Sequence, residues 1–374
     1  MPVYGVWDSR PWRADLLNTF LVLDVPELPM RVLAVGSGID LRRAGEELSA
    51  VLDRPLRDDC PARLSRVGGD RFRLHPEPVA PDEWDDAALL VARRIGEDLL
   101  RALAKVVPDV AGFDHECGTL ALPEAEFADA AEAAAWPVRH RWLLLGAVRA
   151  AVKAGWHTLA AALAARMWVA ASVEADPKWA EELAHWGAEA AIESRRPEAL
   201  AGLLRLSAVW FADHGDFVTA EEHGVRELRA RRRLGDPDGI ADVLWRRAEV
   251  YRRWGRLHLA LDCYRDLEFH YRELADERGA ARVRAATGVV LLAAARPEAA
   301  VAQLERAARV LADLPGVGAG ERAGVLEELG NALWRMGSGD KAVQRYRDAL
   351  ALLESGDDEA ARRVRRLLER AERT

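Results

Sequence analysis

Small and bulky residues recur with a long, regular period in the C-terminal part of the chain, from about Leu204 to Leu353. Four sets repeat every forty positions or so, and in each set the first small residue precedes the last by twelve positions. This spacing predicts a helix, a tight turn and a second, antiparallel helix in every unit. The four sets are Ala208, Phe211, Gly215 and Ala220; Ala248, Tyr251, Gly255 and Ala260; Gly288, Leu291, Ala295 and Ala300; and Gly330, Leu333, Gly337 and Ala342.

The small residues in each set are expected to let the two helices of a unit approach closely where they cross. Each helix pair then needs the next pair to cover its apolar face, so the pattern predicts an array of about six pairs. A charged helix from Asp357 to Arg373 is expected to end the array. Bulky residues on both helices would fill the space between units: Tyr251, Leu333, Tyr264, Leu304 and Tyr346.

Two segments show the repeat most completely, Val325–Gly337 and Lys341–Tyr346. These segments contain a small residue, an aromatic, a glycine, an alanine and a second aromatic, in that order. With this order of residue types the chain resembles the tetratricopeptide repeats. The units here recur after 40, 40 and 42 residues, whereas that family's unit has about 34 residues, so connections such as Gly235–Gly239 are longer. The resemblance implies an all-α fold, a right-handed TPR-like α-solenoid, and says little about function because such scaffolds hold many ligands.

Prolines divide the first 80 residues into short elements that differ from the rest of the chain. Three short helices and a small hairpin predict a winged-helix-like module, for which two hypotheses stay open: contact with DNA, or a wedge that only packs on the array. Its arginines face almost as many acids, and prolines interrupt the helix expected after the wing, which favours the wedge. The predicted elements are helices over Arg13–Leu23, Asp40–Val51 and Pro61–Arg66, and a strand within Gly68–His75.

The middle of the chain is helical but less regular. Apolar residues from Trp84 to Val107 have the spacing of one amphipathic helix, and Pro108–Pro123 is expected to be a loop. The sequence therefore predicts four parts: a winged-helix-like module over 1–80, a linker helix and loop over 81–122, irregular helical repeats over 123–203, and the TPR array with its capping helix over 204–374.

This order of parts carries a second resemblance. A module ending in a glycine, a strand and a histidine, a linker helix, a Trp- and Leu-rich helix pair over Trp142–Trp156, and forty-residue repeats resemble the C-terminal half of actinobacterial STAND signalling NTPases of the antibiotic-regulator type, over residues 28–374. The chain departs from that family because it contains no Gly-x-x-x-x-Gly-Lys-Ser/Thr phosphate-binding loop. Regulation is therefore expected to come from a partner.

Charge and composition narrow the function classes. The formal net charge of −8 gives no electrostatic reason for the whole molecule to bind nucleic acid tightly. Cys60, Cys117 and Cys263 are too few and too scattered for a disulfide framework or a thiolate metal site. No apolar run has the length of a secretion signal or a membrane span, so a cytoplasmic protein is expected.

Signals of enzyme chemistry are weak. The segment Arg31–Gly38 has the pattern of a strand running into a glycine loop, as in a nucleotide- or methyl-donor-binding fold, but no third glycine and no βαβ series follow it. His115 and Cys117 have no matching pair of ligands to complete a metal site. We therefore expect no catalytic residues, no cofactor and no metal.

The first helices of the repeats are expected to line a concave groove, because in this type of superhelix they face inward. Arginine and tryptophan are the residues that most often anchor interfaces, and the stripe at i, i+4 and i+7 contains both. The alternative is that the arginines pair with the many local glutamates. The candidate groove residues are Arg205, Trp245, Arg246, Glu249, Arg252, Arg253, Arg282, Asn331, Trp334 and Arg335.

These features predict a non-enzymatic regulatory scaffold that binds a peptide or protein segment, of acidic character, in the groove. A homodimer is also compatible with the sequence. The alternative is a transcriptional regulator that touches DNA through the N-terminal module and uses the repeats as a sensor or for dimerisation.

Overall fold

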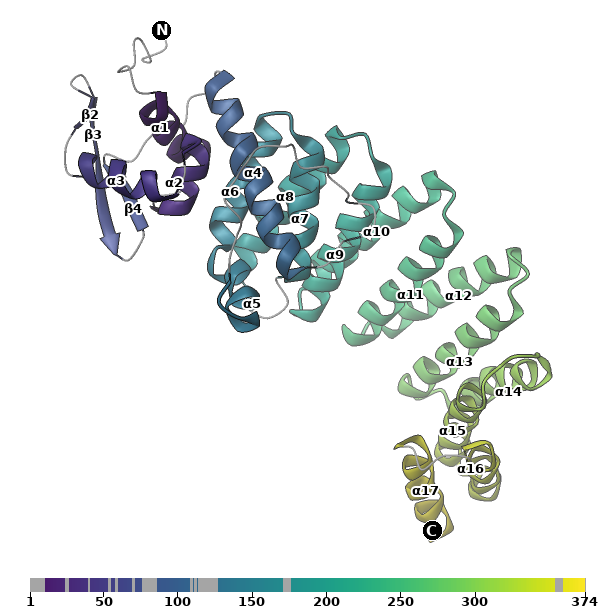
Figure 1. Ribbon diagram of the computed structural model, residues 1–374. Helices are drawn as coiled ribbons and strands as arrows, with labels where there is room; N and C mark the ends of the chain where they lie inside the picture. Colours follow the sequence, from purple (N-terminus) through teal and green to yellow (C-terminus); the bar gives the residue numbers. More distant parts are fainter. Residues whose placement is uncertain are drawn as a thin grey trace. The chain divides into compact units, whose positions relative to one another are not determined.

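The computed structural model describes residues 11–23, 27–39, 41–52, 55–57, 60–68, 71–75, 86–107, 110, 113, 127–170, 176–353 and 359–373 (Figure 1). The chain divides into two compact units, Met1–Gly215 and Asp216–Thr374. The finer division into four parts stays a prediction. His115 and Cys117, and the prolines at 76, 78 and 81, lie outside the described residues.

The first unit begins with three helices and a small antiparallel sheet. The sheet order is β1-β4-β3-β2, with Leu28 opposite Phe72 and Leu64 opposite Leu74. The side chains of these four residues are buried, so one face of the sheet packs inward. The elements are α1 (Pro11–Leu23), β1 (Glu27–Pro29), α2 (Met30–Ser37), α3 (Leu41–Val51), β2 (Pro55–Arg57), β3 (Cys60–Gly68) and β4 (Arg71–His75).

Two predictions for this region are wrong. The helix expected over Pro61–Arg66 lies within strand β3, because its backbone pairs with β4 along most of its length. The strand expected from Arg31 is helix α2, which ends at Gly38 in the left-handed conformation with φ of 66°. Residues 32–37 are all buried, and for a short, buried apolar run periodicity cannot separate helix from strand. The glycine loop of the enzyme alternative is therefore absent from this described segment.

Helix α4 (Asp86–Val106) joins this module to the helices that follow it. Helices α1 and α2 pack on one part of α4, and α6 and α7 pack on another part. Ile95, Leu99 and Leu103 of α4 are buried. The following helices of the first unit are α5 (Ala130–Arg139), α6 (Arg141–Lys153), α7 (His157–Ala170), α8 (Pro177–Glu193) and α9 (Pro197–Asp213).

The second unit consists of successive antiparallel helices, each packed on the next (Figure 1). Aspartates at 216, 236 and 276 accept a hydrogen bond from a backbone N–H of the first turn and so cap the helices that follow them. The helices are α10 (Phe217–Leu234), α11 (Pro237–Arg253), α12 (Leu257–Glu273), α13 (Glu277–Ala293), α14 (Pro297–Asp313), α15 (Ala319–Arg335), α16 (Gly339–Leu353) and α17 (Glu359–Glu372).

The predicted turns are confirmed. Gly215, Gly255 and Gly337 have φ of 82°, 75° and 78°, the left-handed region that glycine enters without strain. At the equivalent position of the third repeat, Ala295 adopts φ of 55°. The local geometry is thus set by the repeat and imposed on alanine as well.

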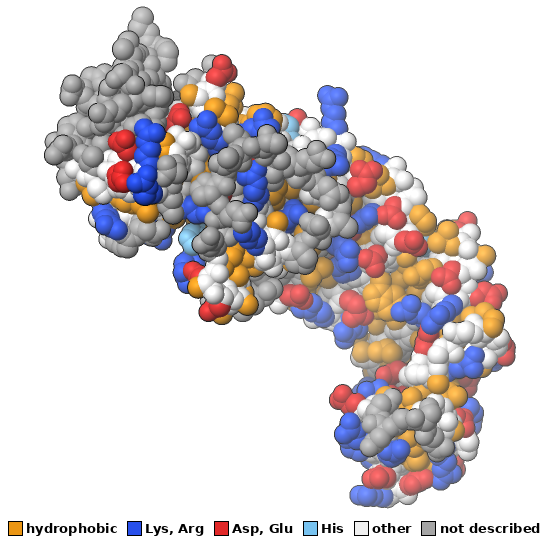
Figure 2. All heavy atoms as spheres, viewed as in Figure 1, with side chains coloured by type: hydrophobic (Ala, Val, Ile, Leu, Met, Phe, Trp, Pro, Cys, Tyr) orange, Lys and Arg blue, Asp and Glu red, His pale blue; other side chains and the backbone are white. Residues whose placement is uncertain are grey.

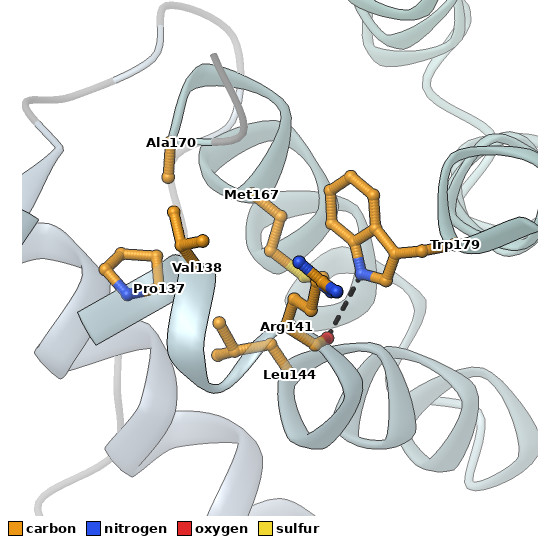
Figure 3. Close-up of a pocket in the computed structure, with 7 residues that line it drawn as sticks. All are labelled: Pro137, Val138, Arg141, Leu144, Met167, Ala170 and Trp179. Carbon is orange, nitrogen blue, oxygen red and sulfur yellow. Dashed lines mark hydrogen bonds between the residues drawn. The ribbon is translucent and has the colours of Figure 1, made fainter. Parts of the chain in front are cut away.

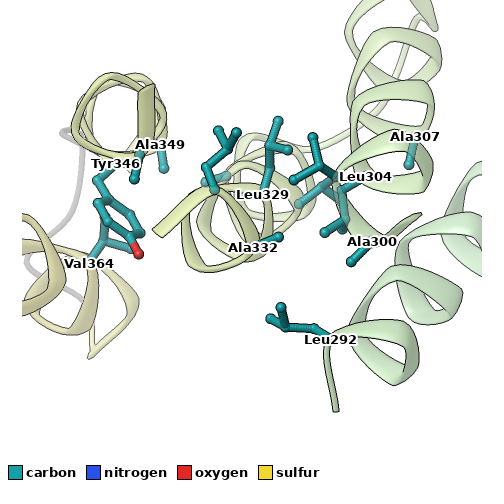
Figure 4. Packing of buried hydrophobic residues seen from close by; sticks show 14 of the residues in the cluster. Leu292, Ala300, Leu304, Ala307, Leu329, Ala332, Tyr346, Ala349 and Val364 are labelled. Atoms are coloured by element: carbon teal, nitrogen blue, oxygen red, sulfur yellow. The ribbon is translucent and has the colours of Figure 1, made fainter. Parts of the chain in front are cut away.

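Small residues do allow close packing within the helix pairs. A Cβ placed on Gly288 would lie 2.6 Å from Cγ of Leu304, so no larger residue fits there without movement. Leu304 and Ala300 of α14 lie beside Leu329 and Ala332 of α15 in one continuous buried cluster (Figure 4). Apart from the N-terminal sheet the described chain is helical, and its helix pairs form the TPR-like α-solenoid that the sequence predicts.

Candidate functional site

Three of the predicted groove residues, Asn331, Trp334 and Arg335, meet at one hollow of about 480 Å³ in the second unit. They lie on the last two turns of α15, and helices α13, α16 and α17 complete the wall. Leu292 and Leu367 contribute apolar surface. The remaining residues that line it are Glu328, Tyr346, Arg370 and Ala371.

The floor of this hollow is held by hydrogen bonds. The Tyr346 hydroxyl donates to Oδ1 of Asn331 at 2.9 Å, and the Asn331 amide donates to Glu328 at 3.3 Å. Burial raises the pKa of Tyr346 to about 12, helped by the charges of Glu327 and Glu328. Burial also raises the pKa of Glu328 above its usual value, and Asn331 opposes this shift. The Asn331 side chain is therefore fixed in orientation before any ligand arrives.

Trp245 and Arg282 meet at a smaller hollow of about 240 Å³. The Arg282 guanidinium carbon lies 5.9 Å from the centre of the Trp245 ring, a cation–π distance. The ring is half-buried and meets Tyr264 of the next helix edge-on at 5.6 Å, so only part of the indole is accessible. Asp238 and Asp242 also line this hollow, so its lining is more acidic than the sequence pattern suggests.

The arginines predicted to flank the groove are largely engaged within the chain. Arg246 donates to Glu227 at 2.6 Å, and Arg252 donates to Glu249 at 2.8 Å. The Arg253 guanidinium lies over the Phe217 ring at 5.7 Å. These contacts agree with the alternative that the sequence left open, in which the arginines interact with nearby residues of the chain.

Arg205 and Glu249 have different surroundings. Arg205 is exposed on α9, in the first unit. Glu249 accepts a hydrogen bond from the Tyr264 hydroxyl at 2.7 Å, and burial together with this carboxylate raises the pKa of Tyr264. The Tyr264–Glu249 bond and the Tyr346–Asn331 bond join equivalent positions of two repeats, so they are a structural feature of the fold as much as of a site.

Sequence reasoning missed the polar contacts between α10 and α11. Glu227 is fully buried and is held by Arg246 and, at 3.7 Å, by Arg231. Arg247 forms two hydrogen bonds with Glu221, which also accepts from the Tyr251 hydroxyl. A signal was present: the other repeats place Leu267, Ala307 and Ala349 where the first has Glu227.

The C-terminal helix also contributes more than the cap that the sequence predicts. Its Leu367 and Arg370 line the Trp334 hollow. Its Arg363 forms two hydrogen bonds, at 2.6 and 2.7 Å, with the buried carboxylate of Glu327 on α15. Helix α17 is thus fixed against α15 of the last repeat.

One depression in the first unit is too small for a ligand. The depression beside Trp179 holds only about 20 Å³ and is lined by Pro137, Val138, Leu144 and Met167 (Figure 3). Trp179 Nε1 donates to the carbonyl of Arg141 at 3.1 Å across it. A space of that size holds about one water molecule, so it is a packing defect between α5, α6, α7 and α8.

The described residues form neither a cluster of metal ligands nor a membrane-spanning helix. No group of three or more His, Cys, Asp or Glu side chains there could hold a metal ion. None of the helices in the described ranges is long and apolar enough to cross a membrane.

No protein-family model matches the chain, and no curated protein matches it. Among solved structures, BtubC (BKLC) from P. vanneervenii is similar at 19% identity and a TM-score of 0.45, over 58% of this chain and 91% of that one. A putative kinesin light chain with TPR-like repeats from Podosopora anserina has 15% identity and a TM-score of 0.40, over 48% and 87%.

A signal transduction ATPase with numerous domains and a tetratricopeptide repeat sensor, from Pyrococcus horikoshii, has 13% identity and a TM-score of 0.39. The match covers 96% of this chain and 52% of that one. With TM-scores below 0.5, these three likenesses carry no conclusion about what the chain binds.

Proposed function

We propose that this protein is a non-enzymatic interaction scaffold that binds a peptide or protein segment at the Trp334 hollow. The observation that supports this most is the meeting of Asn331, Trp334 and Arg335 around about 480 Å³ of open space. Tryptophan and arginine dominate the binding energy of many interfaces when they line a pocket. Arg246 and Arg252 of the predicted groove are paired with glutamates within the chain, so the proposal centres on this one hollow.

The lining favours a segment with a bulky apolar side chain beside a carboxylate. Leu292, Trp334 and Leu367 offer apolar surface for the first group. Arg335 is exposed at the same hollow, where it also donates to the carbonyl of Leu292 at 3.4 Å, and it can donate to the second group as well. The Asn331 amide can contact the backbone of an extended segment. The partner is therefore still expected to be acidic, and its binding is restricted to one end of the array.

A random peptide library displayed on phage tests this proposal. The full-length protein should select peptides that combine an aromatic or aliphatic residue with an acidic one. Trp334→Ala should weaken the selected peptides by about 30-fold or more, the effect of losing a central anchor. Arg335→Ala should weaken acidic peptides more than their amidated counterparts.

The matched control is Trp142→Ala, since Trp142 is 40% exposed and lies in the other unit. Circular dichroism would check that each variant keeps its helices. Selected peptides that bind Trp334→Ala as tightly as the wild type would remove this hollow from consideration.

For the N-terminal module we propose a winged-helix-like fold whose role is to pack against the helices that follow it. The order helix, strand, two helices and hairpin, with β1 beside β4, supports the first part. The packing of α1 and α2 on α4 supports the second. On α3, Arg42 and Arg43 each face a glutamate one turn later, which leaves little net charge for DNA. In this proposal a separate effector replaces the NTPase domain of the STAND proteins that the sequence resembles.

A further inference from the structure

A second hollow, unrelated to the repeat groove, lies within the first unit. It measures about 360 Å³ and is lined by α2, β1 and β4 of the N-terminal module on one side and by residues of α4, α5 and α6 on the other. It is large enough for a small organic molecule, and its lining has two parts of different chemistry.

The first part is aromatic. Trp136 of α5 meets Phe127 edge-on, with ring centres 5.9 Å apart, and lies 5.1 Å from the His140 ring at a tilt of 31°. Nδ1 of His140 lies 3.0 Å from the carbonyl of Trp136, which fixes the imidazole relative to the indole. All three rings line the hollow and are half-buried, so a flat apolar group can lie against them.

The second part is a set of guanidinium groups from three different elements: Arg31 on α2, Arg71 on β4 and Arg139 on α5. Arg31 contacts the buried Asp98 at 2.6 Å. Arg71 is 3.8 Å from Glu27, which Arg73 also contacts. Arg139 is exposed at the C-terminal end of its helix.

The carboxylates of this hollow do not balance the guanidinium groups. Asp98 is 4% exposed and is committed to Arg31. Glu132 accepts a hydrogen bond from the backbone N–H of Ala128 at 2.6 Å, just before the start of its own helix. On the lining itself two carboxylates stand against three guanidinium groups, and Glu27 beside Arg71 is shared with Arg73. Two of the three, Arg71 and Arg139, are exposed enough to reach a ligand.

We propose that this hollow binds a small anion with a flat, apolar body, such as an aromatic carboxylate. The ring lies against Trp136 and Phe127, and the anionic group accepts hydrogen bonds from Arg71 and Arg139. Such a ligand contacts the N-terminal module through Arg71 and the helical part through Arg139, so its binding links the two. This site is independent of the groove and of the peptide proposed there.

The test uses 2-naphthoate as the probe, titrated into the full-length protein by calorimetry. Two comparison probes share its ring: the neutral 2-naphthalenemethanol and the cationic 2-naphthylmethylammonium. We expect 2-naphthoate to bind at least about tenfold more tightly than either, because a charge-assisted hydrogen bond contributes that much. Arg139→Gln should weaken 2-naphthoate by about tenfold and leave the neutral probe unchanged.

Trp136→Leu is the second variant and should weaken both the anionic and the neutral probe. Arg42→Gln is the matched control, because Arg42 is 86% exposed and lies away from this lining; it should bind as the wild type does. Three outcomes would overturn the proposal: equal binding of the three probes, unchanged binding by Arg139→Gln in a variant with wild-type thermal unfolding, or no heat from 2-naphthoate at millimolar concentration.

Discussion

At the scale of single residues, the turns between helices show how the repeat constrains its sequence. Gly255 and Ala295 occupy equivalent turns and make equivalent backbone hydrogen bonds, from Gly255 to Arg252 and from Ala295 to Leu292. Both have positive φ, 75° and 55°. Only glycine adopts this conformation without steric cost.

Ala295→Gly is therefore expected to stabilise the protein. Relief of the left-handed strain contributes about 1–2 kcal/mol, and the greater freedom of glycine in the unfolded chain removes about 0.4–1 kcal/mol. The net gain should be about 0.5–1 kcal/mol, measured as a higher midpoint of urea unfolding.

The reverse change at the equivalent position is the control. A Cβ at Gly255 would meet nothing within 4 Å, so Gly255→Ala isolates the backbone effect and should cost about 1 kcal/mol. If Ala295→Gly lowers stability, the turn of the third repeat is not strained in the way its φ angle implies.

A buried histidine gives the second unit a pH dependence. Burial, and to a smaller extent Arg226, lowers the pKa of His223 from 6.5 to about 4, while Asp216 acts in the opposite direction. The unfolded chain therefore binds a proton between pH 6.5 and 4 that the folded chain does not. Stability contributed by this residue is complete above pH 6.5 and falls as the pH falls to 4.

We expect the wild type to lose about 2 kcal/mol more than His223→Gln between pH 7 and pH 5. Urea unfolding at the two pH values measures the difference. His258 is exposed, so His258→Gln should follow the wild type. A wild type and a His223→Gln variant with the same pH dependence would contradict the lowered pKa.

At the scale of elements, α10 and α11 are joined by ion pairs, and one of these pairs has a buried carboxylate at the position where the later repeats have Leu267, Ala307 and Ala349. Glu227 is fully buried, and Arg246 is its closest cation. Because removal of Arg246 leaves the buried Glu227 carboxylate with only the more distant Arg231, at 3.7 Å, Arg246→Ala should destabilise the protein by about 3 kcal/mol. Thermal unfolding followed by circular dichroism measures it.

The double variant Glu227→Leu with Arg246→Leu separates the pair from the packing. It should recover most of the lost stability, since replacing a whole buried ion pair by apolar residues is often neutral. A double variant as unstable as Arg246→Ala would mean that the side-chain stem of Arg246, not its charge, holds the two helices together.

How far the sequence predicts these elements depends on what each one contacts. The helix pairs were predictable because their small residues and turn glycines act within one repeat, as at Gly288 and Gly255. The strand at Leu64 was not, because its conformation depends on pairing with Leu74 in another strand. The role of Arg246 could not be predicted either: its partner Glu227 lies on the neighbouring helix pair, and spacing along one helix does not identify it.

At the scale of the whole molecule, the two functional hypotheses differ in the surface charge that they require. Among the described residues, basic and acidic side chains are interspersed on the visible face (Figure 2), and the net charge is −8. We expect any binding to duplex DNA to show a shallow salt dependence, corresponding to fewer than about two phosphate contacts. Gel-shift titrations between low and physiological salt measure the slope.

A variant of α3 calibrates that measurement. Glu46 and Glu47 face Arg42 and Arg43, so Glu46→Lys with Glu47→Lys turns a balanced surface into a basic one and should steepen the slope. A steep slope already present in the wild type would favour the transcriptional regulator over the scaffold.

The tyrosine hydrogen bonds within the repeats bear on how such a chain can grow by gene duplication. Tyr264 has its acceptor Glu249, and Tyr346 has Asn331, inside the same helix pair; the intervening pair has Val289 and Leu304 at these positions. Copying a whole pair transmits hydroxyl and acceptor together. Genetic recombination within the turn would place Tyr346 opposite Val289 and leave the tyrosine hydroxyl without an acceptor. Duplication of a whole helix pair is therefore favoured over duplication of a single helix.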